Sequence, residues 1–335
     1  MKGQCFVIVG AMVAFGFAST SVVAQDGTWT PPRTADGHAD LQGVWANNNV
    51  TPLERPEILG TREALTDEEV AALQARAGEL FSSDGGDAAF GDSVFAAALA
   101  EAESFSSRDT ATGNYNQFWM VERDWDNRTS LITDPANGRL PVRTESSNAR
   151  LAARAEARQR HAWGPEDRSL GERCISWGAP RLGAGYNSYF QLFQSASHVV
   201  VYQEMGGPRV IPMDGTPHMT ERVRQLHGDS RGYWEGDTLV IETTNYSPKT
   251  SFMGASRSLQ VVERFTRVSD DTLQLEVTVT DPNTWDAPWT AMIPLRSSSD
   301  PLYEYACHEG NIGMEGIMAG ARALEKAEDG DGGQN

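Results

Sequence analysis

The second half of the chain alternates apolar and polar residues in short runs. Between residues 272 and 281, Leu273, Leu275, Val277 and Val279 alternate with polar residues, a period typical of a strand with one buried face. Similar runs separated by turn-forming residues predict further strands at 188–195, 198–204, 208–213, 231–235, 237–246, 259–268, 289–297 and 302–307. The stretches EGD (235–237) and SDD (269–271) predict tight hairpins within this series.

The first half favours helices. The stretch TDEE, which begins at Thr66, matches a capping box, and the apolar residues that follow predict a helix to about Phe81. Two short strands around a Pro-Ala-Asn-Gly turn are expected at 130–142, and one more at 41–45. Further helices are predicted at about 92–105, 145–162, 217–226 and 310–326.

So many closely spaced strands favour an antiparallel meander, and such sheets usually lose their edges by closing into a barrel. The predicted fold is therefore mainly β, an antiparallel β-barrel with inserted and flanking α-helices. We expect a single domain at 25–327 with a helical insertion at about 60–162. The acidic, Gly-rich residues 328–335 predict a disordered tail.

The first 24 residues have the composition of a cleavable signal peptide. Lys2 precedes an apolar run too short to span a membrane, and small residues end it at Ala24. A periplasmic or secreted location is expected. Outside this segment the cysteines are Cys174 and Cys307. In an oxidising compartment they predict a disulfide, with two free thiols as the alternative.

The formal net charge is −18, which argues against nucleic acid and anionic membrane surfaces as partners. A small molecule is the expected ligand, and the oligomeric state stays open. No phosphate loop, dinucleotide fingerprint or nucleophile elbow is found, so no cofactor is predicted.

Two features of the sequence resemble known proteins. Gly43-Val44-Trp45 in DLQGVW resembles the Gly-x-Trp signature on the first strand of lipocalin-like (calycin) barrels, in which the tryptophan closes the base of the barrel. Longer stretches, among them GDSRGYWEGDTLVIETTNY and YEYACHEGN, resemble a widespread and largely uncharacterised set of secreted bacterial proteins. The resemblance implies export and a single domain, and it implies no reaction.

A first candidate site lies between residues 227 and 246. His227, Asp229 and Arg231 occupy a loop entering a strand, and Glu242 and Asn245 fall near the exit of the next strand. An imidazole near a carboxylate can work as a general base. Alternatively, Asp229 and Arg231 simply cap and pair the turn.

A second candidate site is the pair His308 and Glu309, which follows the last predicted strand. These residues serve either in acid–base chemistry or in a structural role at the strand end. The position where a zinc-protease helix carries its second histidine is Ile312. No metal site is therefore predicted.

A third group supplies candidate substrate-binding residues. On 198–204, His198, Val200, Tyr202 and Glu204 share one face, which points either into the barrel or outward. Together with Glu242 and Asn245, the predicted substrate-binding set comprises Tyr186, Tyr202, Glu204, Arg209 and Trp234.

These residues lead to two main hypotheses. The first is a cofactor-independent lyase, isomerase or hydrolase acting on a small, mostly uncharged organic molecule in the barrel mouth. His227 and His308 would transfer protons, Asp229 and Glu309 would orient them, and Arg231 or Arg209 would stabilise negative charge. The alternative is a periplasmic lipocalin-like binding protein for a small apolar ligand. A structural or partner-binding envelope protein is a third option.

Overall fold

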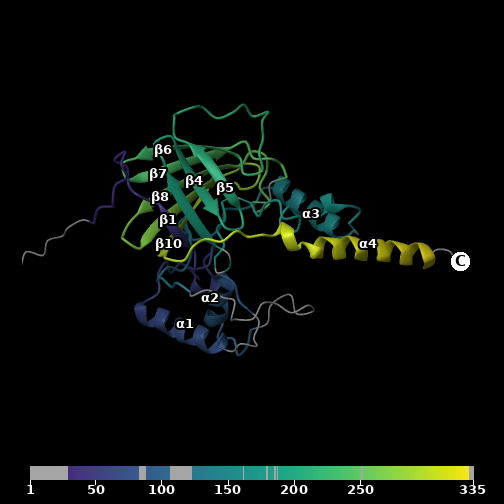
Figure 1. The fold of residues 1–335 in the computed structure, drawn as a ribbon. Coiled ribbons are helices and arrows are strands. Elements are labelled where there is room, and N and C mark those ends of the chain that lie inside the picture. Colours follow the sequence, from purple (N-terminus) through teal and green to yellow (C-terminus); the bar gives the residue numbers. More distant parts are fainter. Residues whose placement is uncertain are drawn as a thin grey trace, which may run out of the picture.

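The computed structural model describes residues 29–82, 88–105, 123–160, 162–178, 180–184, 186, 188–249 and 252–331. The expected signal peptide lies outside these residues. Figure 1 shows a barrel of strands with α1 and α2 below one end, and with α3 and α4 beside it.

The strands form one antiparallel sheet with the order β5-β4-β3-β1-β10-β9-β8-β7-β6, and β2 pairs with β10. Their bounds are β1 Gly43–Ala46, β2 Ile132–Asp134, β3 Tyr189–Gln194, β4 His198–Gln203, β5 Gly207–Pro212, β6 Asp229–Glu235, β7 Thr238–Thr244, β8 Gln260–Arg267, β9 Thr272–Thr280 and β10 Trp289–Ser298. The end strands β5 and β6 pack against each other, with Gly232 facing Ile211 and Met213. The sheet is thus a nearly closed, lipocalin-like barrel, which confirms the predicted fold class.

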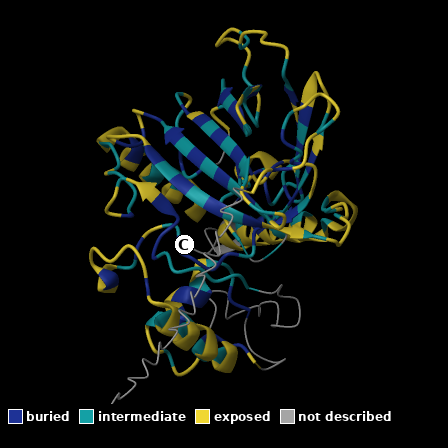
Figure 2. Ribbon diagram, turned by 90° about the vertical axis from the view of Figure 1, so that its left-hand side faces the viewer, coloured by how far each residue is buried: buried dark blue, intermediate teal, exposed yellow. Residues whose placement is uncertain are grey.

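The interior of the barrel is packed with apolar side chains. The inward residues of β9, from Leu273 to Val279, are 0% exposed, and Figure 2 shows the alternation of buried and partly buried residues along the strands. Trp45 is also buried; its indole Nε1 donates to the Leu41 carbonyl oxygen at 2.9 Å. The Arg267 guanidinium lies 5.4 Å from the centre of a Trp45 ring, a cation–π contact.

The helices lie outside the barrel. Their bounds are η1 Glu57–Leu59, α1 Asp67–Leu80, α2 Asp92–Leu99, α3 Glu145–Gln159, η3 Pro165–Asp167, η4 His308–Gly310 and α4 Ile312–Asp331. The capping box at Thr66 is confirmed, because its hydroxyl accepts from Glu69 N while the Glu69 carboxylate accepts from Thr66 N. Helices α1 and α2 share a separate apolar core that includes Phe81 and Phe95.

Two predicted elements are wrong. The strand predicted at 302–307 does not form, because β10 is already flanked by β1 and β9 and the chain leaves the sheet toward Cys307. The segment 217–226 forms turns instead of a helix. Its backbone is bonded to β6 side chains: Met219 N donates to the Asp229 carboxylate at 2.7 Å, and the Arg231 Nε donates to the Pro217 carbonyl oxygen at 3.2 Å.

Element ends also differ from expectation. The helix predicted at 92–105 ends at Leu99, shortly before Glu101, whose φ of 53° is incompatible with a continuing α-helix. Only the first strand of the pair predicted at 130–142 forms; beyond the turn, Leu140 N donates to the Glu54 carboxylate at 3.0 Å. Helix α4 continues to Asp331, into the segment expected to be disordered, and residues 332–335 lie outside the described part.

One ion pair crosses the apolar interior. Arg209 on β5 donates from Nη1 and Nη2 to the two carboxylate oxygens of Glu263 on β8, at 2.6 and 2.7 Å. The two residues are 5% and 0% exposed. This bidentate pair connects the two sides of the junction where β5 and β6 meet without forming a ladder.

We expect Arg209→Met or Glu263→Leu alone to lower the free energy of unfolding by about 3–5 kcal/mol, because each leaves a buried charge uncompensated. The double variant should lose much less than the sum. Urea unfolding of the four proteins measures this. The partly exposed pair Arg264–Glu235 serves as the control, with an expected cost of at most about 1 kcal/mol. Additive losses at 209 and 263 would contradict the interaction.

Candidate functional site

The main cavity lies at one end of the barrel. It has a volume of about 680 Å³ and is bounded by the chain after β1, the start of α2, residues 177 and 181–184, the β4–β5 turn and Tyr305. Its aromatic walls are Phe90, Trp177, Tyr186 and Tyr305. A volume in this range is typical of small-molecule sites.

The helical insertion forms one wall of this cavity because α2 begins close to residues 181–184. Gly91 has a φ of 47°, and a β-carbon there would lie 3.2 Å from the Ala184 carbonyl oxygen. A residue without a side chain therefore suits this position. Next to it, the rings of Phe90 and Tyr186 meet edge to face, with centroids 5.5 Å apart.

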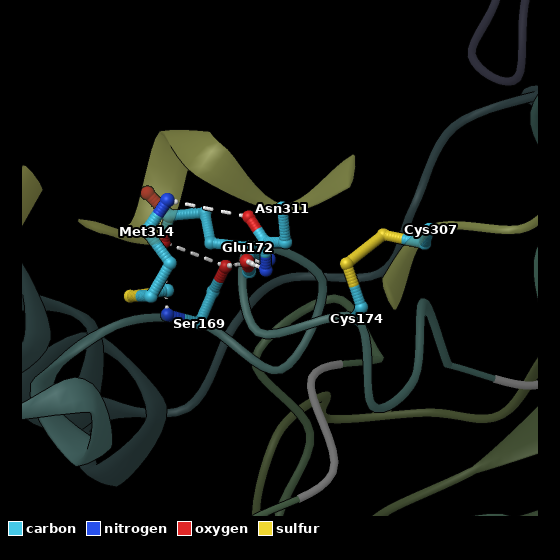
Figure 3. Close-up of a disulfide and its surroundings, with 6 residues drawn as sticks. All are labelled: Ser169, Glu172, Cys174, Cys307, Asn311 and Met314. Carbon is cyan, nitrogen blue, oxygen red and sulfur yellow. Dashed lines mark hydrogen bonds between the residues drawn. A yellow bond between two sulfur atoms is a disulfide. The ribbon is translucent and has the colours of Figure 1, made fainter. Parts of the chain in front are cut away.

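The predicted disulfide between Cys174 and Cys307 is confirmed, and it joins two walls of the cavity. Trp177 follows Cys174 by a few residues and Tyr305 precedes Cys307; their rings form an edge contact with centroids 6.5 Å apart. Nearby, Asn311 Nδ2 donates to the Glu172 carbonyl oxygen at 3.0 Å (Figure 3). The bridge thus holds the C-terminal segment against the loop that carries the cavity's aromatic residues.

Arg181 provides a cationic group in the lining of the cavity. Its Nη1 is buried and has no hydrogen-bond partner among the described residues. Burial lowers the pKa of Arg181, while Glu204 and Tyr305 favour its charged form. Burial also raises the pKa of Glu204, whose Oε2 is likewise buried without a described partner. A buried donor of this kind is stabilised by an acceptor that a ligand can bring.

Asp92 lies at the exposed rim of the same cavity, in the first turn of α2. The protein around it partly desolvates the carboxylate and raises its pKa. The rim therefore carries an acidic group, and the buried residues Asn49 and Thr51 add neutral polar groups to the lining. Both of these are held by Asp126, with Asn49 Nδ2 and Thr51 Oγ1 each 3.1 Å from a carboxylate oxygen.

The predicted pairing of His227 with Asp229 does not form. His227 Nε2 lies 2.7 Å from Ser176 Oγ. The Asp229 carboxylate instead contacts His218 Nδ1 at 3.2 Å and accepts from Arg231 Nη1 at 2.7 Å. Asp229 and Arg231 hold the loop before β6, as the alternative interpretation expected.

The structure also places His308 and Glu309 apart from this group. Both are exposed on η4, the short helix that follows Cys307, and neither lines the cavity. The two predicted catalytic groups are therefore not brought into one site.

Most of the predicted substrate-binding residues have structural contacts. Arg209 is buried and bonded to Glu263. The Trp234 ring stacks on the His38 ring with centroids 4.7 Å apart. The Glu242 carboxylate accepts from the Tyr233 hydroxyl at 3.0 Å. Asn245 Nδ2 donates to the Met219 carbonyl oxygen at 2.8 Å. These four residues therefore hold strands and loops together.

The remaining predicted substrate-binding residues divide in two. On β4, Val201 and Gln203 face inward, so the face with Tyr202 points outward, which resolves the open alternative. Tyr186 does line the cavity, and Glu204 interacts electrostatically with Arg181, which also lines it.

Several residues of the cavity escaped the sequence analysis, namely Arg181, Trp177, Tyr305 and Asp92. The sequence contains only indirect signals that these residues belong to a cavity. A predicted bridge at Cys174 and Cys307 places the residues near each cysteine beside one another, and Arg181 is a lone cation in the Gly- and Ala-rich stretch GAPRLGAG.

The fold and cavity together define a lipocalin-like barrel with one end covered by a helical insertion. Comparison with protein-family models gives no match, and neither do comparisons with curated proteins and with solved structures. Within the described residues, no group of three or more His, Cys, Asp or Glu side chains is arranged to hold a metal ion. In the same part of the chain, none of the helices combines the length and apolarity needed to cross a membrane.

Replacing both Cys174 and Cys307 by Ser should lower the free energy of unfolding by about 4–5 kcal/mol on the chain-entropy model, because the bridge spans a sequence separation of 133. Urea unfolding measures the loss. Wild type treated with a reductant is the control and should match the variant. Two free thiols in the mass spectrum of the unreduced protein would contradict the bridge.

His227 should make stability depend on pH. Burial, assisted by the positive charge of Arg209, lowers the pKa of His227 below the usual histidine value of 6.5. The unfolded chain therefore takes up the proton first as the pH falls. The contribution of the neutral His227 to the free energy of unfolding is complete above pH 6.5. It is lost as the pH falls from there through the lower pKa of the folded state.

We therefore expect His227→Gln to lose less stability than wild type between about pH 8 and about pH 5, measured by urea unfolding at each pH. His198→Gln is the matched control, because that side chain is exposed. An unchanged slope in His227→Gln would contradict the role of its burial.

Proposed function

We propose that the protein binds a small organic molecule with an aromatic or apolar body and one oxygen acceptor in the cavity at the end of the barrel. The observation that carries this proposal is Arg181 Nη1, a buried donor without a described partner in an aromatic-lined cavity. This is the binding-protein alternative of the sequence analysis, with its site assigned to the cavity at the end of the barrel.

The packing of the barrel supports this position. The interior is filled by side chains such as Phe190, Phe265 and Ile293, all of them buried. The cavity outside it has aromatic walls, which bind apolar rings through area burial and stacking. Arg181 then fixes the orientation of the ligand by hydrogen bonding to its oxygen.

The charges favour a ligand with at most one negative charge. The chain has a net charge of −18, and both Asp92 at the rim and Glu204 near Arg181 are acidic. These carboxylates repel a polyanion, whereas one guanidinium suffices for a monocarboxylate or a neutral carbonyl compound. No nucleic acid, membrane or cofactor enters this proposal.

Export forms part of the same proposal. The N-terminal segment has the composition of a signal peptide, and the bridge between Cys174 and Cys307 is of the kind that persists in oxidising compartments. A periplasmic or secreted carrier of a small molecule agrees with both.

A second candidate is an acid–base enzyme, favoured by one observation. His227 Nε2 lies 2.7 Å from Ser176 Oγ, and the lowered pKa of His227 favours the neutral imidazole that a general base requires. Neither residue lines the cavity, although Trp177 next to Ser176 does. Binding therefore stands first.

The test of binding uses naphthoate, an aromatic monocarboxylate, in isothermal titration calorimetry. Arg181→Gln should weaken binding at least about tenfold, because a hydrogen bond to a charged group is lost. Arg139→Gln is the matched control: Arg139 lies outside the cavity and pairs at 3.3 Å with an exposed Glu57. Equal affinities of Arg181→Gln and wild type, or no binding to wild type, would contradict the proposal.

A further inference from the structure

A second hollow lies beside α3 and gathers positive charge. Its volume is about 410 Å³, and it is bounded by the end of α3, the segment 166–173 and the pair Pro248 and Lys249. Five cationic side chains line it: Arg154, Arg158, Arg168, Arg173 and Lys249. Glu166 and Asp167 are the acidic residues of the lining.

The positive charge of this hollow is opposite in sign to the net charge of the chain. The sequence has 28 Lys and Arg residues against 46 Asp and Glu residues. Cations that share one hollow repel one another, so their grouping costs stability unless an anion neutralises them. The hollow is thus a local reversal of the charge that the rest of the protein carries.

Within the described residues, the acidic side chains near the hollow pair with only some of these cations. Arg168 pairs with Glu172, and Arg173 lies 3.5 Å from the largely exposed Glu166. The Asp167 carboxylate accepts from two backbone N–H groups, those of Trp163 at 2.9 Å and Gly164 at 3.3 Å.

Three cations of the hollow are left without an ion pair in the described part of the chain: Arg154, Arg158 and Lys249. Arg154 and Arg158 are one helical turn apart on α3, so they project from the same face. Lys249 approaches from the separate loop after β7. Three donors from two elements therefore border one hollow.

We infer that this hollow binds a small polyanion of the phosphate or sulfate type, at a site separate from the proposed aromatic cavity. Guanidinium groups match the oxygen pairs of phosphate and sulfate in a bidentate manner. The charge requirement is opposite in the two places: the cavity at the barrel end has acidic groups near a single arginine, whereas this hollow has a cationic excess.

The probe is inorganic pyrophosphate, titrated into the full-length protein with its disulfide intact, at constant ionic strength. We expect saturable binding in calorimetry and a higher melting temperature with pyrophosphate than with chloride. The double variant Arg154→Gln/Arg158→Gln should weaken pyrophosphate binding at least about tenfold. Adding Lys249→Gln to this double variant should weaken the binding further.

The matched control is Arg139→Gln/Arg296→Gln, which removes the same charge from two exposed ion pairs elsewhere. It should retain wild-type affinity for pyrophosphate. Naphthoate binding should be unchanged in Arg154→Gln/Arg158→Gln, which separates this inference from the function proposed above. Melting temperatures without pyrophosphate verify that all variants fold.

Three results would overturn the inference. Pyrophosphate that stabilises no more than chloride shows that there is no specific site. An equal loss of affinity in the control shows that only net charge matters. Binding to phosphatidylglycerol vesicles without binding to pyrophosphate assigns the cations to a lipid surface instead.

Discussion

The ion pair between Arg209 and Glu263 is the constraint on which the barrel depends. It crosses a largely apolar interior and connects β5 with β8, on either side of the junction that has no ladder. A register shift of one residue on β5 would turn Arg209 outward and leave Glu263 buried alone. The pair therefore fixes which face of β5 points inward. It also fills space that an open lipocalin-like barrel would offer to a ligand.

Because side chains fill the barrel, the cavity lies at its end, and the additions to the barrel form the walls of this cavity. The insertion brings Phe90 and the start of α2, and the loop after Cys174 brings Trp177 and Arg181. Since the described residues of this loop form no helix or strand, the disulfide supplies the restraint that a strand would otherwise provide. The rigid sheet thus supports a site made almost entirely of loops.

Local patterns in the sequence were sufficient for the sheet and insufficient for the site. The period of two in β9 and the capping box at Thr66 are short-range signals, and both predictions are confirmed. The segment 302–307 has the composition of a strand, but no free edge of β10 remains to pair with it. His227 and Asp229 are neighbours in sequence, yet their side chains meet different partners, Ser176 and His218. Arg181 shows no pattern of its own, because its setting comes from packing between distant segments.

The origin of the cavity walls has a consequence for biosynthesis. They come from positions between Asn49, shortly after the first strand, and Tyr305, just before the second cysteine of the bridge. A chain that has not yet emerged past its last strand lacks one wall entirely. Until the two cysteines are joined, that wall is also untethered. Under the proposed function, the binding site is therefore complete only in a chain that has been synthesised past Tyr305 and whose two cysteines are joined.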